Sequence, residues 1–166
     1  MTARSMQVLD FLESASLPYS FLSHKRVAAM AECAYVEAKT NVLMPRNLFL
    51  CTKNKSGCYL LLAHPESRFV TANVSKRVGS SRLSFGDEAL LKLLLNADPG
   101  AVSPFGLIYD TEHRVKLLAD TRILKEKELM FHPLEGNCSV IISMNVFINA
   151  FLPLTGHDLT LVDMDV

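Results

Sequence analysis

The segment NLFLCTKNKSGCYLLLA limits the possible folds of this chain more than any other. Two apolar runs, residues 48–51 and 58–63, flank a polar turn at residues 53–57. Apolar runs joined by a short glycine-containing turn are typical of a β-hairpin, and Gly57 can take a positive φ in such a turn. The pattern therefore predicts a hairpin whose strands are buried, and Cys51 and Cys58 can face each other across it.

Helices are predicted on both sides of this hairpin. Apolar residues recur at helical spacing from Ser5, the expected N-cap, to Pro18, and residues 27–39 are rich in Ala, Glu and Met. Ser84 is the expected N-cap of a helix at residues 86–95, whose sequence ALLKLLL predicts a broad buried face. Shorter helical patterns occupy residues 73–77 and 145–154.

The remaining apolar segments predict strands, at residues 19–23, 115–118, 129–132, 139–143 and 159–162. Residues 121–128 are charged and favour neither state. Helices and strands mix without a regular βαβ repeat, so the predicted class is α+β, or mixed α/β. We expect one domain over residues 1–166, with a central mixed β-sheet and flanking helices.

Length and composition agree with one folded domain. The chain has 166 residues, of which 49% are hydrophobic and 20% charged, an ordinary globular composition. Its apolar runs are far shorter than the ~20 residues that cross a bilayer. The first 17 residues lack the continuous apolar region of a secretory signal. We therefore expect no membrane partner and a cytoplasmic location.

Charge is distributed unevenly although the net charge is zero. Residues 1–83 contain 11 Lys and Arg against 5 Asp and Glu, a balance of +6, whereas residues 84–166 contain 6 against 12, a balance of −6. Such asymmetry lets one face attract phosphate while the whole molecule stays neutral. Chance clustering on a solvated surface explains the same numbers equally well.

The four cysteines do not suggest a metal site. Cys33, Cys51, Cys58 and Cys138 show no CxxC spacing, and none lies two to four residues from a histidine. A cytosolic chain would keep Cys51 and Cys58 reduced even if they face each other. We expect no metal and no cofactor.

Three segments contain residues suited to chemistry. In PRNLFL, Arg46 directly precedes a buried strand and offers a fork of donors for phosphate or carboxylate. In GAVSP, residues 100–104, glycine and proline can hold backbone N–H groups in a fixed direction, as an oxyanion requires. In FHPLEGNCS, Pro133 restricts the backbone of His132, whose imidazole titrates near neutrality.

Each segment also has a simpler interpretation. Arg46 can be a surface residue in a salt bridge, the loop an ordinary turn, and His132 a structural histidine. Cys138 lies six residues after His132, so a Cys–His nucleophile pair is an alternative, but only Asn137 is available to orient it.

Taken together, the motifs resemble the ProX branch of the YbaK/ProX family, which is similar to the editing insertion of bacterial prolyl-tRNA synthetases. The resemblance spans essentially the whole chain. It is carried, in order, by PRNLFL, SRLSFGDEALLKLL, PGAVSPFGLIYD, FHPLEGN and FINAFLPLTGHDLTLVDM. It implies a mixed sheet with flanking helices, and hydrolysis of the ester that joins a wrong amino acid to tRNA(Pro).

The resemblance also implies roles for individual residues. The catalytic loop would be Gly100, Ala101, Val102, Ser103 and Pro104, contacting the aminoacyl group and the terminal adenosine, and His132 would hold one of these two groups. Arg46 would anchor the tRNA acceptor end. Other expected substrate or tRNA contacts are Asn47, Phe105, Gly106, Phe131 and Asn137. Prolyl-tRNA synthetase is a possible partner.

Two positions depart from the family pattern. Arg46 stands where the family usually has Lys, so a compact ammonium becomes a planar fork. Asn137 lies five residues after His132 rather than about four, with Gly136 between them. A changed pocket, and therefore a different amino acid, is compatible with both departures.

The sequence leads to one mechanistic hypothesis and three alternatives. Water would attack the ester with help from the 2′-hydroxyl of the terminal adenosine, while amides of residues 100–103 stabilise the oxyanion and His132 orients the substrate. Phe105, Leu107, Ile108 and Phe131 would form a sieve for small side chains. The alternatives are editing of Ser, Thr or Cys, an inactive module that binds tRNA or a partner, and a small-molecule sensor.

Overall fold

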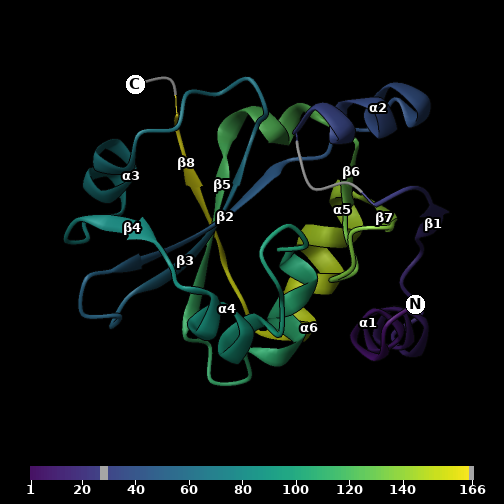
Figure 1. Cartoon of the computed structure of the whole chain (residues 1–166), viewed down its shortest axis with the longest axis horizontal. Coiled ribbons are helices and arrows are strands. Elements are labelled where there is room, and N and C mark those ends of the chain that lie inside the picture. Colours follow the sequence, from purple (N-terminus) through teal and green to yellow (C-terminus); the bar gives the residue numbers. More distant parts are fainter. Residues whose placement is uncertain (27–29, 165–166) are drawn as a thin grey trace.

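The computed structural model describes residues 1–26 and 30–164. Within them, the strands form two sheets that lie next to each other along the longest axis of the molecule (Figure 1). The predicted α+β class is confirmed. The expected central mixed sheet is the five-stranded one, which has antiparallel and parallel pairs. A second, three-stranded sheet lies beside it, so the expected number of sheets is corrected from one to two.

The five-stranded sheet contains the predicted hairpin, formed by β2 (Arg46–Thr52) and β3 (Cys58–Ala63). β2 also pairs antiparallel with β4 (Leu83–Phe85), whereas β3 pairs in parallel with β5 (Val115–Asp120), and β5 with β8 (Leu159–Val162). Alternate residues of β3 enter two apolar clusters, one with side chains of α3 and the other with side chains of α4. Every residue of β3 is therefore buried.

Two details of the hairpin can be compared with the sequence. Cys51 and Cys58 face each other, as expected, with their Sγ atoms 3.4 Å apart and both thiols free. The positive φ in the turn belongs to Lys55, at 60°, and not to Gly57. Gly57 instead donates its N–H to Thr52 Oγ1 at 3.0 Å, and this bond closes the turn without a left-handed glycine.

The three-stranded sheet is antiparallel, in the order β1 (Ser20–Ser23), β7 (Cys138–Ser143), β6 (Glu128–Phe131). A parallel bridge from Leu43 to Leu129 connects β6 to the segment that leads into β2. Met130 donates its N–H to the Leu43 carbonyl at 2.9 Å. The two sheets thus meet at this bridge, where the segment that leads into β2 runs parallel to β6.

The helices agree with the predicted segments, but two of the expected caps are wrong. Helix α1 (Ala3–Ser14) is capped by Thr2, whose hydroxyl accepts the Ser5 N–H, and Ser5 lies inside the helix. Helix α4 (Glu88–Leu95) is capped by Asp87, because Ser84 belongs to β4. Helices α2 (Met30–Thr40) and α3 (Thr71–Val78) also agree with predicted helical segments. The first residues of the predicted helix 27–39 lie outside the described residues.

The last helical segment is less regular than its sequence suggested. It begins as α5 (Met144–Val146), widens into a π turn over Phe147–Phe151, and continues as α6 (Leu152–Thr155). Pro153 has no N–H to donate, so the ladder of helical hydrogen bonds is interrupted near this turn. The ring of Phe151 then packs edge-on against Phe11 of α1, with centroids 5.8 Å apart.

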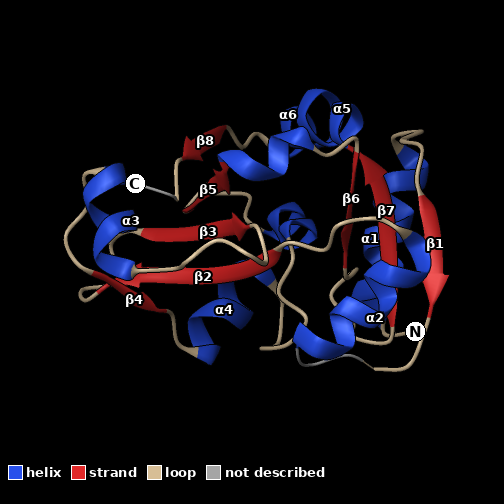
Figure 2. Cartoon of the chain, turned by 90° about the horizontal axis from the view of Figure 1, so that it is seen from above, coloured by secondary structure: helices blue, strands red, loops and turns tan. Residues whose placement is uncertain are grey.

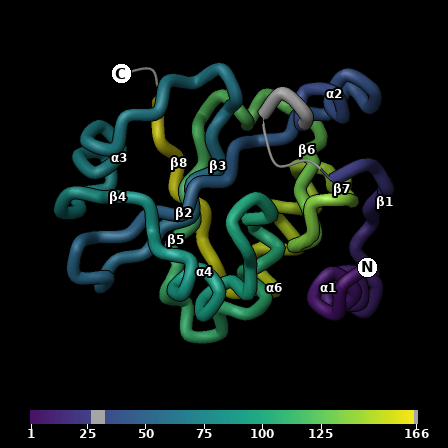
Figure 3. The backbone as a smooth tube through the Cα atoms, viewed as in Figure 1, coloured from purple at the N-terminus to yellow at the C-terminus, as the bar shows by residue number. Residues whose placement is uncertain are grey.

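Helix α1, helix α2 and the three-stranded sheet occupy one end of the molecule, whereas α3 and β4 lie at the other (Figures 2 and 3). Two 3-10 helices complete the described structure, η1 (Pro104–Tyr109) and η2 (Thr121–Lys125). Pro104, the last residue of the GAVSP segment, is therefore the first residue of η1. No helix in the described part of the chain has the length and apolar character needed to span a membrane.

Candidate functional site

The loop of residues 98–103 connects α4 to η1 and has a fixed shape. Gly100 has φ +82°, a left-handed conformation that favours glycine, and a Cβ there would meet nothing within 4 Å. Ser103 is completely buried, and its hydroxyl accepts the Phe105 N–H at 3.1 Å. Pro104 follows as the first residue of η1. The glycine and the capping serine thus set the path of the loop.

Only some of the amides in this loop are engaged. The Ala101 N–H donates to the carbonyl oxygens of Asp98 and Pro99, at 3.1 and 2.8 Å. Within residues 1–26 and 30–164, no hydrogen bond engages the N–H groups of Gly100, Val102 or Ser103. Unpaired N–H groups in one loop can bind an anionic oxygen. Ala101, which the sequence grouped with them, uses its N–H to stabilise the loop itself.

His132 follows β6 and is 5% exposed. One ring nitrogen, Nδ1, lies 2.9 Å from the Cys138 carbonyl oxygen. A carbonyl only accepts, so Nδ1 carries the proton and Nε2 presents its lone pair when the ring is neutral. Burial lowers the pKa of His132 below its usual value, and His24 nearby adds to this effect. The imidazole is therefore neutral at pH 7 and has a defined tautomer.

The loop and the histidine segment meet in the core. Phe105 follows Pro104, Phe131 precedes His132, and their rings pack edge to face with centroids 5.8 Å apart. Both phenylalanines are completely buried, and Leu107 is 1% exposed. These three side chains have almost no free surface, so they support the two segments from behind. Of the four residues expected to form a sieve, Ile108 alone is partly exposed.

Gly106, expected to contact substrate, has a packing role. It is buried, and a Cβ at this position would lie 2.6 Å from the carbonyl oxygen of Leu95 and 2.8 Å from its Cβ. The backbone of η1 can approach the end of α4 this closely only because residue 106 has no side chain. This contact fixes the C-terminal end of the loop.

Arg46 and Asn47 begin β2, three and four residues after the bridge at Leu43. Arg46 donates from Nη2 to the Ser67 carbonyl at 2.8 Å. Its Nε and the Oδ1 of Asn47 are buried and have no hydrogen-bond partner among the described residues. A buried polar atom without a partner costs about 1–3 kcal/mol, so a ligand that satisfies it gains binding energy.

The turn between β6 and β7 contains the last of the expected residues. Asn137 is exposed, and its carbonyl oxygen accepts the His24 N–H at 3.0 Å. Leu134 in the same turn is buried with φ 62°, a strained conformation for leucine that the surrounding structure must hold in place. The turn that carries His132 is thus held in a conformation that its own sequence does not favour.

A cavity of about 630 Å³ lies between the end of β1 and α2, in the volume range of ligand sites. The ring of His24 in its wall lies 6.0 Å from the ring of His132. Tyr35, which is 68% exposed, contributes an aromatic face. Three of the described lining residues are basic and none is acidic; the full set is Leu22, Ser23, His24, Lys25, Arg26, Tyr35, Val36 and Lys39.

None of the motifs PRNLFL, GAVSP and FHPLEGNCS points to this cavity. The signal was present in the run His24, Lys25, Arg26 directly after a strand, and in the i, i+4 spacing of Tyr35 and Lys39 on one helix. A basic run beside an exposed aromatic ring is a pattern typical of nucleic-acid binding.

The alternative Cys–His pair is not assembled as a nucleophile and base. His132 Nδ1 bonds to the backbone of Cys138 and not to its thiol. Burial raises the pKa of the Cys138 thiol to about 11, so it is protonated near neutral pH. In the described part of the chain, no group of three or more His, Cys, Asp or Glu is arranged to hold a metal ion.

The family comparison defines the class of this α+β domain. Residues 24–150 match the family model of the aminoacyl-tRNA editing domain. The chain belongs to this family, and within it to the YbaK/ProX-like proteins that its motifs resemble.

Particular relatives narrow the comparison. The chain is 26% identical over 136 residues to the prolyl-tRNA editing protein ProX of Acetoanaerobium sticklandii, covering 82% of this chain and 83% of the relative. It is 30% identical over 124 residues to prolyl-tRNA synthetase associated domain-containing protein 1 of Bos taurus, covering 72% and 71%. A crystal structure described as a candidate trans-editing enzyme for prolyl tRNA synthetase shares the fold, with TM-score 0.69, 18% identity and coverage of 99% and 98%.

Proposed function

We propose that this protein is a trans-acting deacylase, which hydrolyses the ester between a small, wrongly attached amino acid and tRNA, with alanyl-tRNA(Pro) as the first candidate substrate. Family membership supports editing in general. One observation carries the proposal. The loop of residues 98–103, which has unpaired N–H groups, is connected by the Phe105–Phe131 ring contact to the segment that contains His132, a neutral imidazole with a fixed tautomer. We infer that the protein acts in the cytoplasm, where tRNA is charged.

The loop amides would stabilise the transition state. Attack on an ester carbonyl places negative charge on its oxygen, and the N–H groups of Gly100, Val102 and Ser103 are the candidate donors. Each well-placed donor contributes about 3–4 kcal/mol to lowering such a barrier. Their value depends on preorganisation, which Gly100, Ser103 and the packing of Gly106 support.

His132 would position the substrate. Its Nε2 lone pair can accept a hydrogen bond from the α-amino group of the amino acid or from a ribose hydroxyl. The attacking water would be assisted by the 2′-hydroxyl of the terminal adenosine, so the side chains need not supply a strong nucleophile. His132 would orient this reaction without acting as its sole base.

The basic cavity would receive the end of the RNA. A terminal base can stack on the exposed Tyr35 ring, and phosphates can pair with Lys25, Arg26 and Lys39. Arg46, with its unpaired Nε, is a further candidate anchor. The excess of positive charge in residues 1–83 supports this assignment, since all of these residues belong to that half.

Such an enzyme corrects an error that a proline site cannot avoid. A missing methylene changes binding by only about 1–3 kcal/mol, so a synthetase pocket for proline admits smaller amino acids. A second site that accepts only small acyl groups removes them and spares proline. The relatives named for prolyl-tRNA editing support tRNA(Pro), and a prolyl-tRNA synthetase as partner is part of the same proposal.

The amino acid can be identified with a panel of esters. Purified protein is incubated with tRNA(Pro) carrying alanine, serine, threonine, cysteine or proline, and release of each amino acid is followed. We expect alanine to be released fastest and proline to remain attached. Preferential release of serine, threonine or cysteine would retain the editing function and change the substrate. Failure to release any of them would refute the deacylase.

The role of the adenosine is tested separately, with alanyl-tRNA(Pro) that lacks the terminal 2′-hydroxyl. We expect hydrolysis of the deoxy substrate to be strongly reduced. An undiminished rate would rule out assistance by this hydroxyl, and the loop and His132 would then have to activate water directly.

The inactive-module alternative is tested by Arg46→Lys. If the planar guanidinium had cost the protein its activity, the lysine variant would gain a large rate of hydrolysis. We expect no such gain, because Arg46 keeps the positive charge and its bond to the Ser67 carbonyl fixes its direction.

A further inference from the structure

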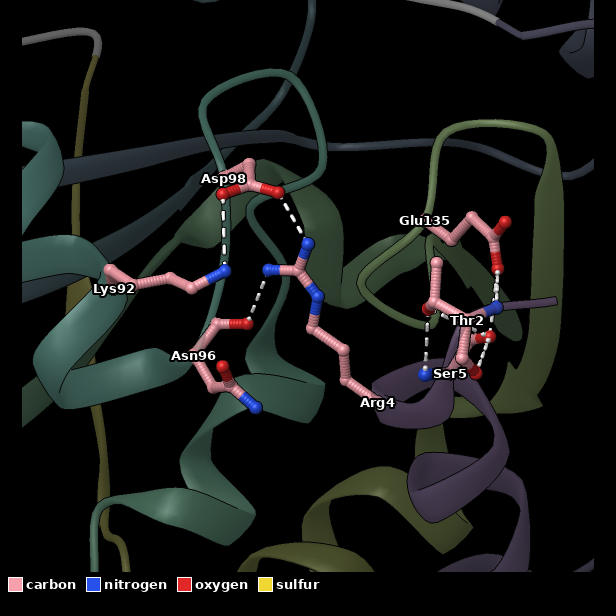
Figure 4. Close-up of polar contacts among 7 residues, drawn as sticks. All are labelled: Thr2, Arg4, Ser5, Lys92, Asn96, Asp98 and Glu135. Carbon is pink, nitrogen blue, oxygen red and sulfur yellow. Dashed lines mark hydrogen bonds and ion pairs between the residues drawn. The ribbon is translucent and has the colours of Figure 1, made fainter.

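The first turn of α1 lies between the two loops of the candidate site and is bonded to both (Figure 4). On one side, Arg4 donates to the Asn96 carbonyl at 2.9 Å and forms an ion pair with Asp98. On the other side, one carboxylate oxygen of Glu135 accepts the Thr2 N–H at 2.8 Å and the Ser5 hydroxyl at 2.7 Å. Side chains from three distant parts of the sequence therefore converge on one turn.

The anchored residues belong to the segments that carry the proposed chemistry. Asp98 begins the loop that contains Gly100, and Glu135 lies in the turn that follows His132. The two segments touch each other in the core through Phe105 and Phe131, whereas these outer contacts are made to α1. We call the contacts of Arg4 and Glu135 with their partners the α1 clamp.

The helix is a firm base for such a clamp. Ser5, Val8 and Leu12 are at most 1% exposed, so α1 is anchored in the core. The partial positive charge of a helix N-terminus attracts the Glu135 carboxylate. The guanidinium of Arg4 binds two acceptors at once, and its side chain is only 19% exposed. Movement of either loop would break charge-assisted hydrogen bonds at this turn.

We propose that Arg4 and Glu135 are positioning residues for the deacylation reaction. They hold the loop of residues 98–103 and the turn between β6 and β7 at the spacing that a small acyl group requires. The inference rests on the proposed function. Neither residue needs to touch the substrate, because a displacement of about 1 Å in a catalytic group can cost roughly 100-fold in rate.

Each side of the α1 clamp can be weakened by one substitution. Arg4→Met keeps the apolar stem of the side chain and removes its contacts with Asn96 and Asp98, and Glu135→Gln removes the negative charge that faces Thr2 and Ser5. For each variant, kcat and KM are measured with alanyl-tRNA(Pro), and the rate on seryl-tRNA(Pro) gives acyl discrimination. We expect kcat to fall by about 10-fold or more, KM to stay within about 2-fold, and discrimination to change. Arg4→Lys keeps the charge but not the fork, so we expect a rate between those of Arg4→Met and wild type.

The matched control is Lys55→Met. Lys55 forms an ion pair with Asp87, at the hairpin turn of the five-stranded sheet. Exposed ion pairs add little to overall stability, so this variant reports the general effect of removing one. We expect its kcat and its discrimination to equal those of the wild type. A loss of kcat in Arg4→Met that is no greater than in the control would overturn the proposal.

Amide hydrogen exchange tests, independently of activity, whether the α1 clamp restrains the two loops. In Arg4→Met, we expect faster exchange at the Ala101 N–H; in Glu135→Gln, we expect it across residues 134–137. Amides of β3 should keep their wild-type protection in both variants. Unchanged exchange in the two loops would overturn the clamp even if activity fell. If wild-type protein hydrolysed no ester of the panel, the proposed function would fail, and exchange alone would decide whether α1 fixes the loops.

Discussion

The two ring nitrogens of His132 have different roles: Nδ1 donates to the Cys138 carbonyl, and Nε2 is left to contact the substrate. The side-chain amide of an asparagine can occupy the position of Nδ1, and that of a glutamine the position of Nε2. We expect His132→Asn to keep the fold and lose about 100-fold in kcat. We expect His132→Gln to lose about 1–3 kcal/mol in stability, because the Cys138 carbonyl loses its donor. Single-turnover deacylation and urea unfolding check both; a fully active His132→Asn would refute the role of Nε2.

The same residue predicts how stability depends on pH. The folded pKa of His132 lies below the usual 6.5, mainly because the ring is buried. Between the folded pKa and 6.5 the unfolded chain binds more protons, so the free energy of unfolding must fall as pH decreases through this window. Urea unfolding at pH 7.5 and 5.5 should show this decrease, and His132→Asn should show a smaller one. Equal slopes in both proteins would contradict a buried, neutral imidazole.

Among the structural elements, the loop of residues 98–103 offers a test with an internal control. Gly100 and Gly79 have φ values of +82° and +70°, and a Cβ would meet nothing within 4 Å at either. Gly79 ends α3, at the other end of the molecule from α1. Replacing either by alanine should cost about 1–2 kcal/mol of stability from backbone strain alone.

Only one of these alanine variants should affect catalysis. We expect Gly100→Ala to reduce kcat by about 10-fold or more, because the strain shifts the N–H donors of the loop, and Gly79→Ala to leave kcat unchanged. Deacylation by folded protein, corrected with unfolding curves, makes the comparison. Equal activity in the two variants would show that the loop does not hold the oxyanion.

The whole molecule combines a basic N-terminal half with an acidic C-terminal half, and the cavity between β1 and α2 collects basic residues of the first. Changing Lys25, Arg26 and Lys39 together to Gln should weaken tRNA binding and lower the slope of log affinity against log salt by up to about 3. Lys116→Gln, on exposed β5 surface, is the control. An unchanged salt slope in the triple variant would remove the cavity from the RNA-binding surface.

The sequence predicted the presence of the helices and strands better than the residues at which they begin. The hairpin and the helices were identifiable because periodicity is local, and the resemblance placed Gly100 and His132 in one site. Ser5 and Ser84 were wrong as caps because another polar residue three positions away, Thr2 or Asp87, directly precedes each helix. The backbone path decides between such neighbouring polar residues.

Long-range geometry was beyond the sequence pattern. The division into two sheets depends on where the chain bends after Leu43, which periodicity does not record. The contact of Thr2 with Glu135 joins residues separated by 133 positions. Burial also changed interpretations, since Phe105 and Phe131 look like pocket residues in sequence but are enclosed in the core.

Selective deacylation is tested most sharply with two esters on the same RNA, alanyl-tRNA(Pro) and prolyl-tRNA(Pro), under single-turnover conditions with wild-type protein and His132→Asn. We expect the wild-type protein to release alanine rapidly and to leave proline attached, and His132→Asn to release alanine slowly. Hydrolysis of both esters at the same rate, or of neither, would contradict selective deacylation.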